Sequence, residues 1–414
     1  MQDNEKKPAL RFKGFTDPWE QRKLGEICDF ITKGATPTTY GFSWQPDGVP
    51  FFRNDSIKDN VFVFGEFSYI SEAANEVLKR SEVHGNDILI AITGDIGKVG
   101  IIPDTVEKAN INQHIARVRI RKEALPYFVY QYLASDDTQK EYQKIKTGLS
   151  MPQLSLEQVR DIVVKIPEFN EQGKIADCLR RIDTLITLHQ RKYEKLVNIK
   201  KSMLDKMFPK NGASVPEIRF KGFTDPWEQR KLSDIVEKVT EKNAGLQYIE
   251  TFTNSAEFGI ISQRDFFDHD ISKIGSLDGY YVVHNEDFVY NPRISVTAPV
   301  GPINRNKLGR TGVMSPLYTV FRPHDIDTTY LEHFFKSGYW HSFMNFNGDS
   351  GARSDRFSIK DSVFFEMPIP TPDIEEQKKI GEFLTQLDTL ITLHQRKLEK
   401  LQNIKKSCLE KMFV

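Results

Sequence analysis

Apolar residues recur at every seventh position along two long stretches of the chain, residues 171–207 and 375–412. A period of seven with one apolar stripe is typical of a coiled-coil helix, and two such helices in one chain can pair with each other. The predicted seam positions are Ile175, Ile182, His189, Leu196 and Met203 in the first helix and Ile380, Leu387, His394, Leu401 and Cys408 in the second, with Phe383, Leu390 and Ile404 beside it.

Each predicted seam contains one histidine, His189 or His394, at the corresponding position. A polar seam residue can set the register of the two helices, as a buried Asn does. A metal site or a pH switch is the alternative for a histidine pair. The register-setting role is favoured.

The two helices belong to an internal repeat. The segment RFKGFTDPWEQRKL occupies residues 11–24 and again 219–232, and DTLITLHQRK occupies 183–192 and 388–397. One unit of about 205 residues is therefore written twice, although the inserts at 25–147 and 233–350 share almost no sequence. If a pseudo-two-fold axis relates the copies, the helices run antiparallel. The arm at 11–24 should then dock at the end of the second helix, near Val414. Trp19 and Trp227 are most simply packing anchors, with binding of a partner subunit as the alternative.

The inserts show short alternating patterns that predict strands, at 87–93, 99–102 and 115–120 in the first and at 280–283, 287–290 and 317–321 in the second. Amphipathic helices are predicted at 125–146 and 327–346, and Pro167 and Pro372 should end the elements before them. The fold class is α+β: two globular α+β domains separated by two long helices that form an antiparallel intramolecular coiled coil. The predicted domains are 1–170, a spacer helix at 171–210, 211–374 and a second spacer at 375–414.

Composition narrows the function. Lys and Arg number 57 and so do Asp and Glu, which is unusual for a free-standing nucleic-acid binder. Residues 190–210 carry seven basic against two acidic side chains, and 395–414 carry six against two. This basic excess is either a solvated face, a positive rail along a duplex or a docking face for partner subunits. Three cysteines form no disulfide framework, and the chain shows no leader or membrane span, so a cytoplasmic protein is expected.

No segment carries a complete active site. The loop at 93–100 lacks the GxxxxGK[ST] spacing of a phosphate-binding loop and is better explained as a hairpin turn. Asn291-Pro292 begins a segment one residue short of the Asn-Pro-Pro-aromatic loop of adenine methyltransferases. We therefore expect the chain not to be catalytic and to hold neither metal nor cofactor.

Polar loops in both inserts suit DNA recognition, because Arg pairs with guanine, Asn and Gln with adenine, and Ser or Thr with either. Solvated loops can carry the same residues, so each one alone is a weak signal. The pair Arg353 and Arg356 is the strongest candidate. The full set is Arg53, Asn54, Lys98, Asn112, Gln113, His114, Ser150 and Gln153 in the first insert and Gln263, Arg264, Arg293, Ser295, Arg353, Ser354 and Arg356 in the second.

Taken together, the arms (Arg11–Trp19, Arg219–Trp227), the Ile-Pro…Glu-Gln segments (Ile166–Gln172, Ile369–Gln377) and the helix repeats resemble the specificity subunit of a type I restriction-modification system. The resemblance implies that each domain recognises one half of a bipartite DNA target while the coiled coil sets the gap. It implies as partners double-stranded DNA, two modification subunits that bind S-adenosylmethionine and methylate adenine, and restriction subunits that hydrolyse ATP with Mg²⁺. No membrane partner is implied.

Two alternatives remain open at this point. The chain could be a self-contained adenine DNA methyltransferase of unusual layout, with Asn291-Pro292 in its active site. It could also be a coiled-coil scaffold whose inserts bind proteins or glycans rather than DNA.

Overall fold

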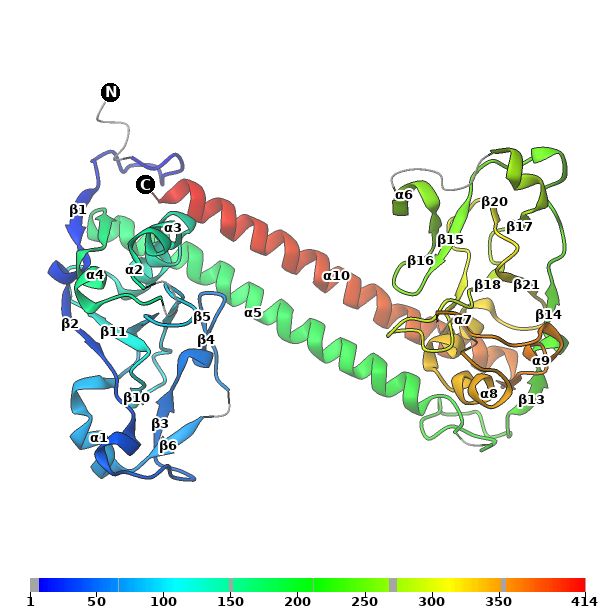
Figure 1. Cartoon of the computed structure of the whole chain (residues 1–414), viewed down its shortest axis with the longest axis horizontal. Coiled ribbons are helices and arrows are strands. Elements are labelled where there is room, and N and C mark those ends of the chain that lie inside the picture. Colours follow the sequence, from blue (N-terminus) through cyan, green and yellow to red (C-terminus); the bar gives the residue numbers. More distant parts are fainter. Residues whose placement is uncertain are drawn as a thin grey trace. The chain divides into compact units, whose positions relative to one another are not determined.

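The structure is a computed structural model that describes residues 7–65, 67–148, 152–210, 212–267, 274–350 and 355–413. The chain divides into two compact units (Figure 1). Unit 1 comprises residues 1–190 and 396–414, and unit 2 comprises residues 191–395. Each unit therefore holds one insert, one arm and part of each long helix.

The long helices are α5 (Phe169–Lys206) and α10 (Ile374–Met412). In unit 1 the start of α5 lies beside the end of α10 (Figure 1), and Asp183 pairs with Lys405 at 2.7 Å. In unit 2 the end of α5 packs on the start of α10, and Lys200 pairs with Asp388. The two ion pairs are related by the repeat. The predicted antiparallel pairing is thus present within each unit.

Of the ten seam positions, Ile175, Ile380 and Leu387 are buried and the other seven are half-buried, the two histidines among them. The second row of the seam lies four residues further on, at Leu179 and its heptad equivalents. Leu390 and Ile404 were placed beside the seam, but they are 42 % and 40 % exposed. The second row of the seam lies four residues beyond the first, whereas Leu390 and Ile404 lie three residues beyond it. Their side chains therefore face away from the partner helix.

Each arm ends in a strand that closes its own unit. In unit 1, β1 (Glu20–Lys23) pairs antiparallel with β12 (Val163–Ile166); in unit 2, β13 (Glu228–Lys231) pairs with β22 (Pro368–Thr371). The Leu10 N–H donates to the Lys411 carbonyl at 2.7 Å, so the first arm does dock at the end of the second helix, although Val414 itself lies outside the described residues. Trp19 and Trp227 are both buried. The predictions for the arms are confirmed.

The repeated Arg and Glu-Gln residues join each arm to its helix. Arg11 donates to both carboxylate oxygens of Glu171 at 2.7 and 2.8 Å, and Arg219 does the same to Glu376 at 2.8 Å. Both glutamates are fully buried. A bidentate guanidinium–carboxylate pair combines charge with fixed geometry. It therefore holds the arm in one position on the first turn of the helix.

The neighbouring glutamine links the helix to the insert that precedes it. The Gln172 side chain accepts from the Leu125 N–H at 2.8 Å and donates to the Pro167 carbonyl at 3.0 Å. Gln377 makes the same two bonds in unit 2, at 2.9 and 2.8 Å. As predicted, Pro167 and Pro372 end the strands that precede the helices.

The two inserts share a central antiparallel sheet despite their unlike sequences. In unit 1 the strand order is β2 (Cys28–Lys33), β11 (Ile115–Ile120), β8 (Ile88–Ala91) and β9 (Val99–Ile101). In unit 2 it is β14 (Val236–Lys238), β21 (Thr319–Pro323), β18 (Phe288–Tyr290) and β19 (Ile303–Arg305). The same topology shows that the inserts are copies of one fold.

A repeated turn supports this relationship. Asp87 and Asp287 each accept a bidentate pair of bonds from an arginine on the adjacent strand, Arg119 or Arg322. Each aspartate also accepts from the backbone N–H three residues before it, in a turn whose next-to-last residue has a φ of about +70°. The His-x-x-Asp sequence at 84–87 and 284–287 is the visible trace of this turn.

The remaining elements match only in part: the antiparallel pairs next to the His-x-x-Asp turns, 82–83 with 109–110 and 281–283 with 312–314, are equivalent, and the others differ. Unit 1 adds a sheet in the order β6 (Ser68–Ile70), β3 (Val49–Phe52), β10 (Ala109–Ile111) and β7 (Glu82–Val83), the pair β4 (Ile57–Lys58) and β5 (Val61–Phe62), and helix α1 (Glu72–Val77). Unit 2 adds the pairs β15 (Phe252–Ser255) with β16 (Gly259–Ser262) and β17 (Tyr281–Val283) with β20 (Gly312–Met314), and helix α6 (Gln263–Phe267).

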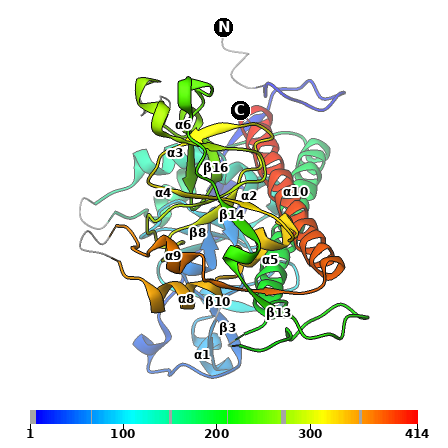
Figure 2. The same cartoon turned by 90° about the vertical axis from the view of Figure 1, so that its right-hand side faces the viewer.

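Both predicted amphipathic helices are interrupted. The segment 125–146 forms α2 (Pro126–Leu133) and α3 (Asp136–Ile145), and 327–346 forms α7 (Thr328–Ser337) and α8 (Trp340–Asn347). Gly338 at the second break has a φ of +79°, which a helix cannot continue through. Short helices that were not predicted, α4 (Leu156–Asp161) and α9 (Asp361–Phe364), precede β12 and β22. Helices α8 and α9 lie close together in both views (Figure 1, Figure 2).

Candidate nucleic-acid interface

Polar side chains from four segments of unit 1 meet at the end of strand β8. We call this group the Thr93 cluster; its members are Thr36, Asn54, Thr93, Gln113 and His114. Thr36 follows β2, Asn54 follows β3, Thr93 follows β8, and Gln113 and His114 lie between β10 and β11. Three of the five, Asn54, Gln113 and His114, were candidates from the sequence.

Hydrogen bonds connect the whole cluster. Asn54 Nδ2 donates to the Thr93 carbonyl at 2.8 Å, and Thr93 Oγ1 bonds His114 Nδ1 at 2.6 Å. His114 Nε2 bonds Gln113 Nε2 at 3.0 Å, and the Thr36 hydroxyl bonds Gln113 Oε1 at 2.5 Å. The Oδ1 atom of Asn54 is buried and has no hydrogen-bond partner within the described residues. The cluster is thus an ordered polar group, with one buried acceptor left unpaired within the described residues.

The backbone places these side chains together. The Ile92 N–H donates to the His114 carbonyl at 2.9 Å, which continues the β8–β11 ladder. Gly34 allows the chain after β2 to approach, because a Cβ there would lie 1.9 Å from the Ile111 carbonyl oxygen. Gln153 joins from the segment before α4, since its backbone forms a bridge with Thr93.

The other candidates of unit 1 lie around this cluster or are engaged locally. Arg53 is exposed, donates to Ser68 Oγ at 2.8 Å and stacks 4.8 Å from the Trp44 ring centroid. Lys98 lies in the β8–β9 hairpin and pairs with Asp95, so the 93–100 loop is the predicted turn. Asn112 accepts from the His114 N–H at 3.2 Å. Ser150 lies outside the described residues.

In unit 2, two exposed arginines meet at the end of strand β18. Arg293 follows β18 and forms a backbone bridge with Arg356, which precedes α9. The Phe357 N–H donates to the Pro292 carbonyl at 2.7 Å. Two guanidinium groups are thus carried by neighbouring backbone segments. We call this feature the arginine bridge.

The arginine bridge and the Thr93–Gln153 contact occupy equivalent positions. In unit 1 the Leu154 N–H donates to the Ile92 carbonyl at 2.9 Å, as Phe357 does to Pro292 in unit 2. Each bridge joins a residue just beyond the end of β8 or β18 to the segment that leads into the spacer helix. One backbone arrangement therefore presents Thr and Gln in unit 1 but two arginines in unit 2.

The remaining candidates of unit 2 are more varied. Ser295 is exposed beside Thr297 in the loop after Arg293. Gln263 is buried, and its Oε1 has no partner within the described residues, while Arg264 beside it is exposed. Arg353, expected from the sequence to be a principal contact, and Ser354 lie outside the described residues.

Asn291 does not form a methyltransferase pocket. Its Nδ2 donates to the Asn254 carbonyl at 2.8 Å and its Oδ1 accepts from the Arg293 N–H at 3.0 Å. Both ends of the amide therefore hold the loop that carries Arg293, which is a supporting role for the arginine bridge.

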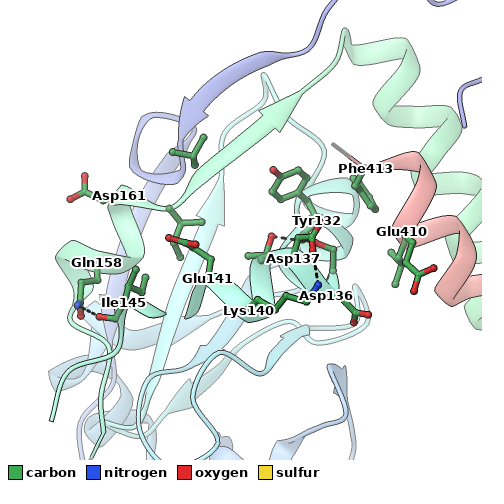
Figure 3. A pocket seen from close by; sticks show the side chains of 15 residues that line it. Tyr132, Asp136, Asp137, Lys140, Glu141, Ile145, Gln158, Asp161, Glu410 and Phe413 are labelled. Carbon is green, nitrogen blue, oxygen red and sulfur yellow. Dashed lines mark hydrogen bonds and ion pairs between the residues drawn. The ribbon is translucent and has the colours of Figure 1, made fainter. Parts of the chain in front are cut away.

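Each unit also contains a cavity, and only the one in unit 2 borders a candidate surface. A cavity of about 540 Å³ in unit 1 lies among α3, α4 and the end of α10 (Figure 3). Its rim carries five carboxylates, which repel phosphate, so it is unsuited to DNA: Asp136, Asp137, Glu141, Asp161 and Glu410. A cavity of about 480 Å³ in unit 2 borders Arg356 and includes Tyr281, Tyr290 and Tyr318. Burial raises the pKa of Tyr290, so its hydroxyl stays neutral.

Within the described ranges, no group of three His, Cys, Asp or Glu side chains is arranged to hold a metal ion. None of the helices in the described part of the chain is both long enough and apolar enough to cross a bilayer.

Comparison with known proteins assigns the family. The model of the type I restriction modification DNA specificity domain matches this chain twice, over residues 16–198 and 224–403. The chain belongs to this family. The two matched segments correspond to the two copies of the internal repeat. As a specificity protein the chain is the non-catalytic, DNA-recognising component, which rules against the self-contained methyltransferase and the non-DNA scaffold.

Two relatives match at low identity over nearly the full length. The chain is 24 % identical over 416 residues to the putative type I restriction enzyme MjaX specificity subunit of Methanocaldococcus jannaschii, covering 94 % of this chain and 91 % of that one. It is 23 % identical over 410 residues to the MjaVIII specificity subunit of the same organism, with the same coverage. The crystal structure of the type I restriction-modification S subunit from M. genitalium covers 99 % of both chains with a TM-score of 0.60 at 13 % identity, which supports the fold.

Proposed function

We propose that unit 1 and unit 2 each recognise one half of a bipartite DNA target through the Thr93 cluster with Gln153 and through the arginine bridge, respectively. The observation that carries this proposal is that equivalent backbone positions present Thr and Gln in one unit and two arginines in the other. A shared frame with different hydrogen-bonding side chains is what an asymmetric target requires.

The chemistry of the two surfaces suggests different bases. An arginine can donate two bonds to guanine O6 and N7, so the arginine bridge suits a guanine in its half-site. Glutamine matches adenine, and a threonine hydroxyl can serve either base. The remaining candidates, Arg53, Lys98, Asn112, Ser295 and Arg264, are better suited to phosphates or to neighbouring bases.

Partner subunits complete the proposed activity. Since the chain has no net charge, local basic surfaces such as 190–210 and 395–414, together with the other subunits, would supply phosphate contacts. We propose that modification subunits bring S-adenosylmethionine and methylate adenine, and that restriction subunits bring ATP and Mg²⁺, while this chain binds none of these itself. The two spacer helices would set the gap between half-sites, and the complex would act in the cytoplasm.

The experiment compares Arg356→Ala with Lys360→Ala in the full chain assembled with its modification subunits. Binding to a pool of duplexes with randomised positions gives the preferred bases in each half-site. We expect Arg356→Ala to relax one half-site by about 1–3 kcal/mol and to leave the other unchanged.

Lys360 is an exposed cation in the same unit, so its removal should weaken binding evenly or not at all. Equal loss at both half-sites in Arg356→Ala, or an unchanged base preference, would contradict the proposal.

A further inference from the structure

The side chains of Thr36, Gln113, His114 and Thr93 form an unbroken series of hydrogen bonds. The contacts are Thr36 Oγ1 to Gln113 Oε1 at 2.5 Å, Gln113 Nε2 to His114 Nε2 at 3.0 Å, and His114 Nδ1 to Thr93 Oγ1 at 2.6 Å. In such a series each donor fixes the role of the next group. We call it the Thr36–Thr93 relay.

The direction of the relay follows from the atoms at each contact. Gln113 Oε1 can only accept, so the Thr36 hydroxyl donates to it. Gln113 Nε2 can only donate, so His114 Nε2 accepts. A neutral imidazole carries its one proton on the other nitrogen, so His114 Nδ1–H donates to Thr93 Oγ1. The Thr93 oxygen then receives a bond, and its own hydrogen is available to a ligand.

We infer that Thr93 is a specificity-determining residue whose hydroxyl is held as a hydrogen-bond donor by this relay, so that it selects a base edge presenting an acceptor. The inference rests on the proposed function, since it specifies how unit 1 recognises its half-site. In the major groove the acceptors are guanine O6 and N7, adenine N7 and thymine O4, whereas cytosine N4 and adenine N6 are donors.

The frame around Thr93 restricts it enough for this role. Asn54 holds its carbonyl, the bridge to Gln153 holds its backbone, and the β8–β11 register holds His114 beside it. A threonine hydroxyl that can rotate freely accepts and donates equally, so it discriminates little between bases. The bond from His114 removes that freedom.

Among the described residues of unit 2, the equivalent positions do not form such a relay. Its strand register places Leu317 where unit 1 has His114, and Arg293 where unit 1 has Thr93. An arginine side chain is always a donor and needs no neighbour to set its direction. The relay thus gives a short neutral side chain in unit 1 the one-way character that Arg293 has intrinsically.

Gln113→Glu tests the relay because a carboxylate can only accept. At pH 9, where imidazole is neutral, His114 Nε2–H must then donate to Glu, His114 Nδ1 must accept, and Thr93 must donate to it. The Thr93 oxygen would then face a ligand as an acceptor only. Gln113→Ala is the matched variant, because it breaks the relay without reversing it.

The first measurement is the tautomer of His114 by ¹⁵N NMR of the full chain with labelled histidine, assigned with His114→Gln. We expect Nδ1–H in the wild type and Nε2–H in Gln113→Glu. A wild-type ring protonated on Nε2, or an unchanged tautomer in Gln113→Glu, would overturn the relay. This measurement requires no DNA.

The second measurement is base preference, from a pool of randomised duplexes bound by the full chain with its modification subunits. We expect one position of one half-site to change from acceptor-bearing to donor-bearing bases in Gln113→Glu, by about tenfold in relative affinity. In Gln113→Ala the preference should be lost without reversal. If the tautomer switches in Gln113→Glu but the variant only binds all sequences more weakly by the same factor, the role of Thr93 in specificity is refuted. Absence of any base preference in the wild type would refute the proposed function, and the NMR result would remain independent of it.

Discussion

The buried ion pairs that hold the two arms allow a quantitative comparison between the repeats. In unit 1, Arg11→Ala would leave the Glu171 carboxylate, which is 0 % exposed, without its two charged bonds. In unit 2, Arg219→Ala would do the same to Glu376. Breaking a buried pair by removing one partner costs about 3–5 kcal/mol, because the remaining charge is uncompensated.

The two units differ in one further bond. The Trp227 indole N–H donates to Glu376 Oε2 at 3.1 Å, whereas the equivalent Trp19 Nε1 has no hydrogen-bond partner within the described residues. A hydrogen bond to a charged group contributes about 1.5–3 kcal/mol. Glu376 therefore keeps part of its stabilisation when Arg219 is removed. We expect Arg219→Ala to be less destabilising than Arg11→Ala by about 2 kcal/mol.

Hydrogen exchange measured by mass spectrometry separates the units when the peptides extend past the identical arm segments, because Gly25-Glu26 follows the first arm and Ser233-Asp234 follows the second. A loss of 3–5 kcal/mol corresponds to exchange about a hundredfold to several thousandfold faster in the first arm. The double variant Arg11→Met with Glu171→Leu is the control, since replacing both charges by apolar groups restores much of the stability. Equal losses in the two arms, or less than about 1 kcal/mol for Arg11→Ala, would refute this reasoning.

Two further predictions concern packing and pH. Gly97→Ala should destabilise unit 1 by about 1–3 kcal/mol more than Gly94→Ala in urea unfolding, because both have φ above +70° but only a Cβ at Gly97 would meet the Tyr142 ring, at 2.6 Å; equal effects would contradict it. Burial, together with Lys336, lowers the pKa of His333 to about 4. The folded form therefore binds this proton only at a lower pH than the unfolded chain does. Stability of unit 2 should therefore fall as pH drops from about 6.5 to 4, and His333→Gln should flatten that slope; a slope unchanged in the variant would argue against this origin.

The long helices were predictable because their signal is local. A heptad pattern over more than thirty residues predicted that the helices begin at 171 and 375, close to the observed first residues Phe169 and Ile374. The arms followed from exact duplication plus symmetry. The meaning of the Glu-Gln repeat was not predictable, since Arg11 reaches Glu171 across 160 residues and only folding brings them together.

The inserts were less predictable because their decisive contacts are non-local. Single strands were found, but the common sheet order depends on pairings such as β2 with β11 that no local pattern encodes. Thr93 was not a candidate, although Gln113 and His114 were, because its hydroxyl gains a role only through strand pairing with a segment 21 residues later. The repeated His-x-x-Asp sequence was the available signal that the inserts share a fold.

The structure separates what the repeat preserves from what it varies. Three contacts are kept in both copies: Arg to Glu, Gln to backbone, and Asp to Arg. They join the arm, the sheet and the helix. None of them lies at the bridge that carries Thr93 or Arg293. Substitutions at the bridge can therefore change hydrogen-bonding character while these framework contacts stay intact. This separation explains why two inserts with almost no common sequence can retain one topology, and why a duplicated chain can present two unlike surfaces.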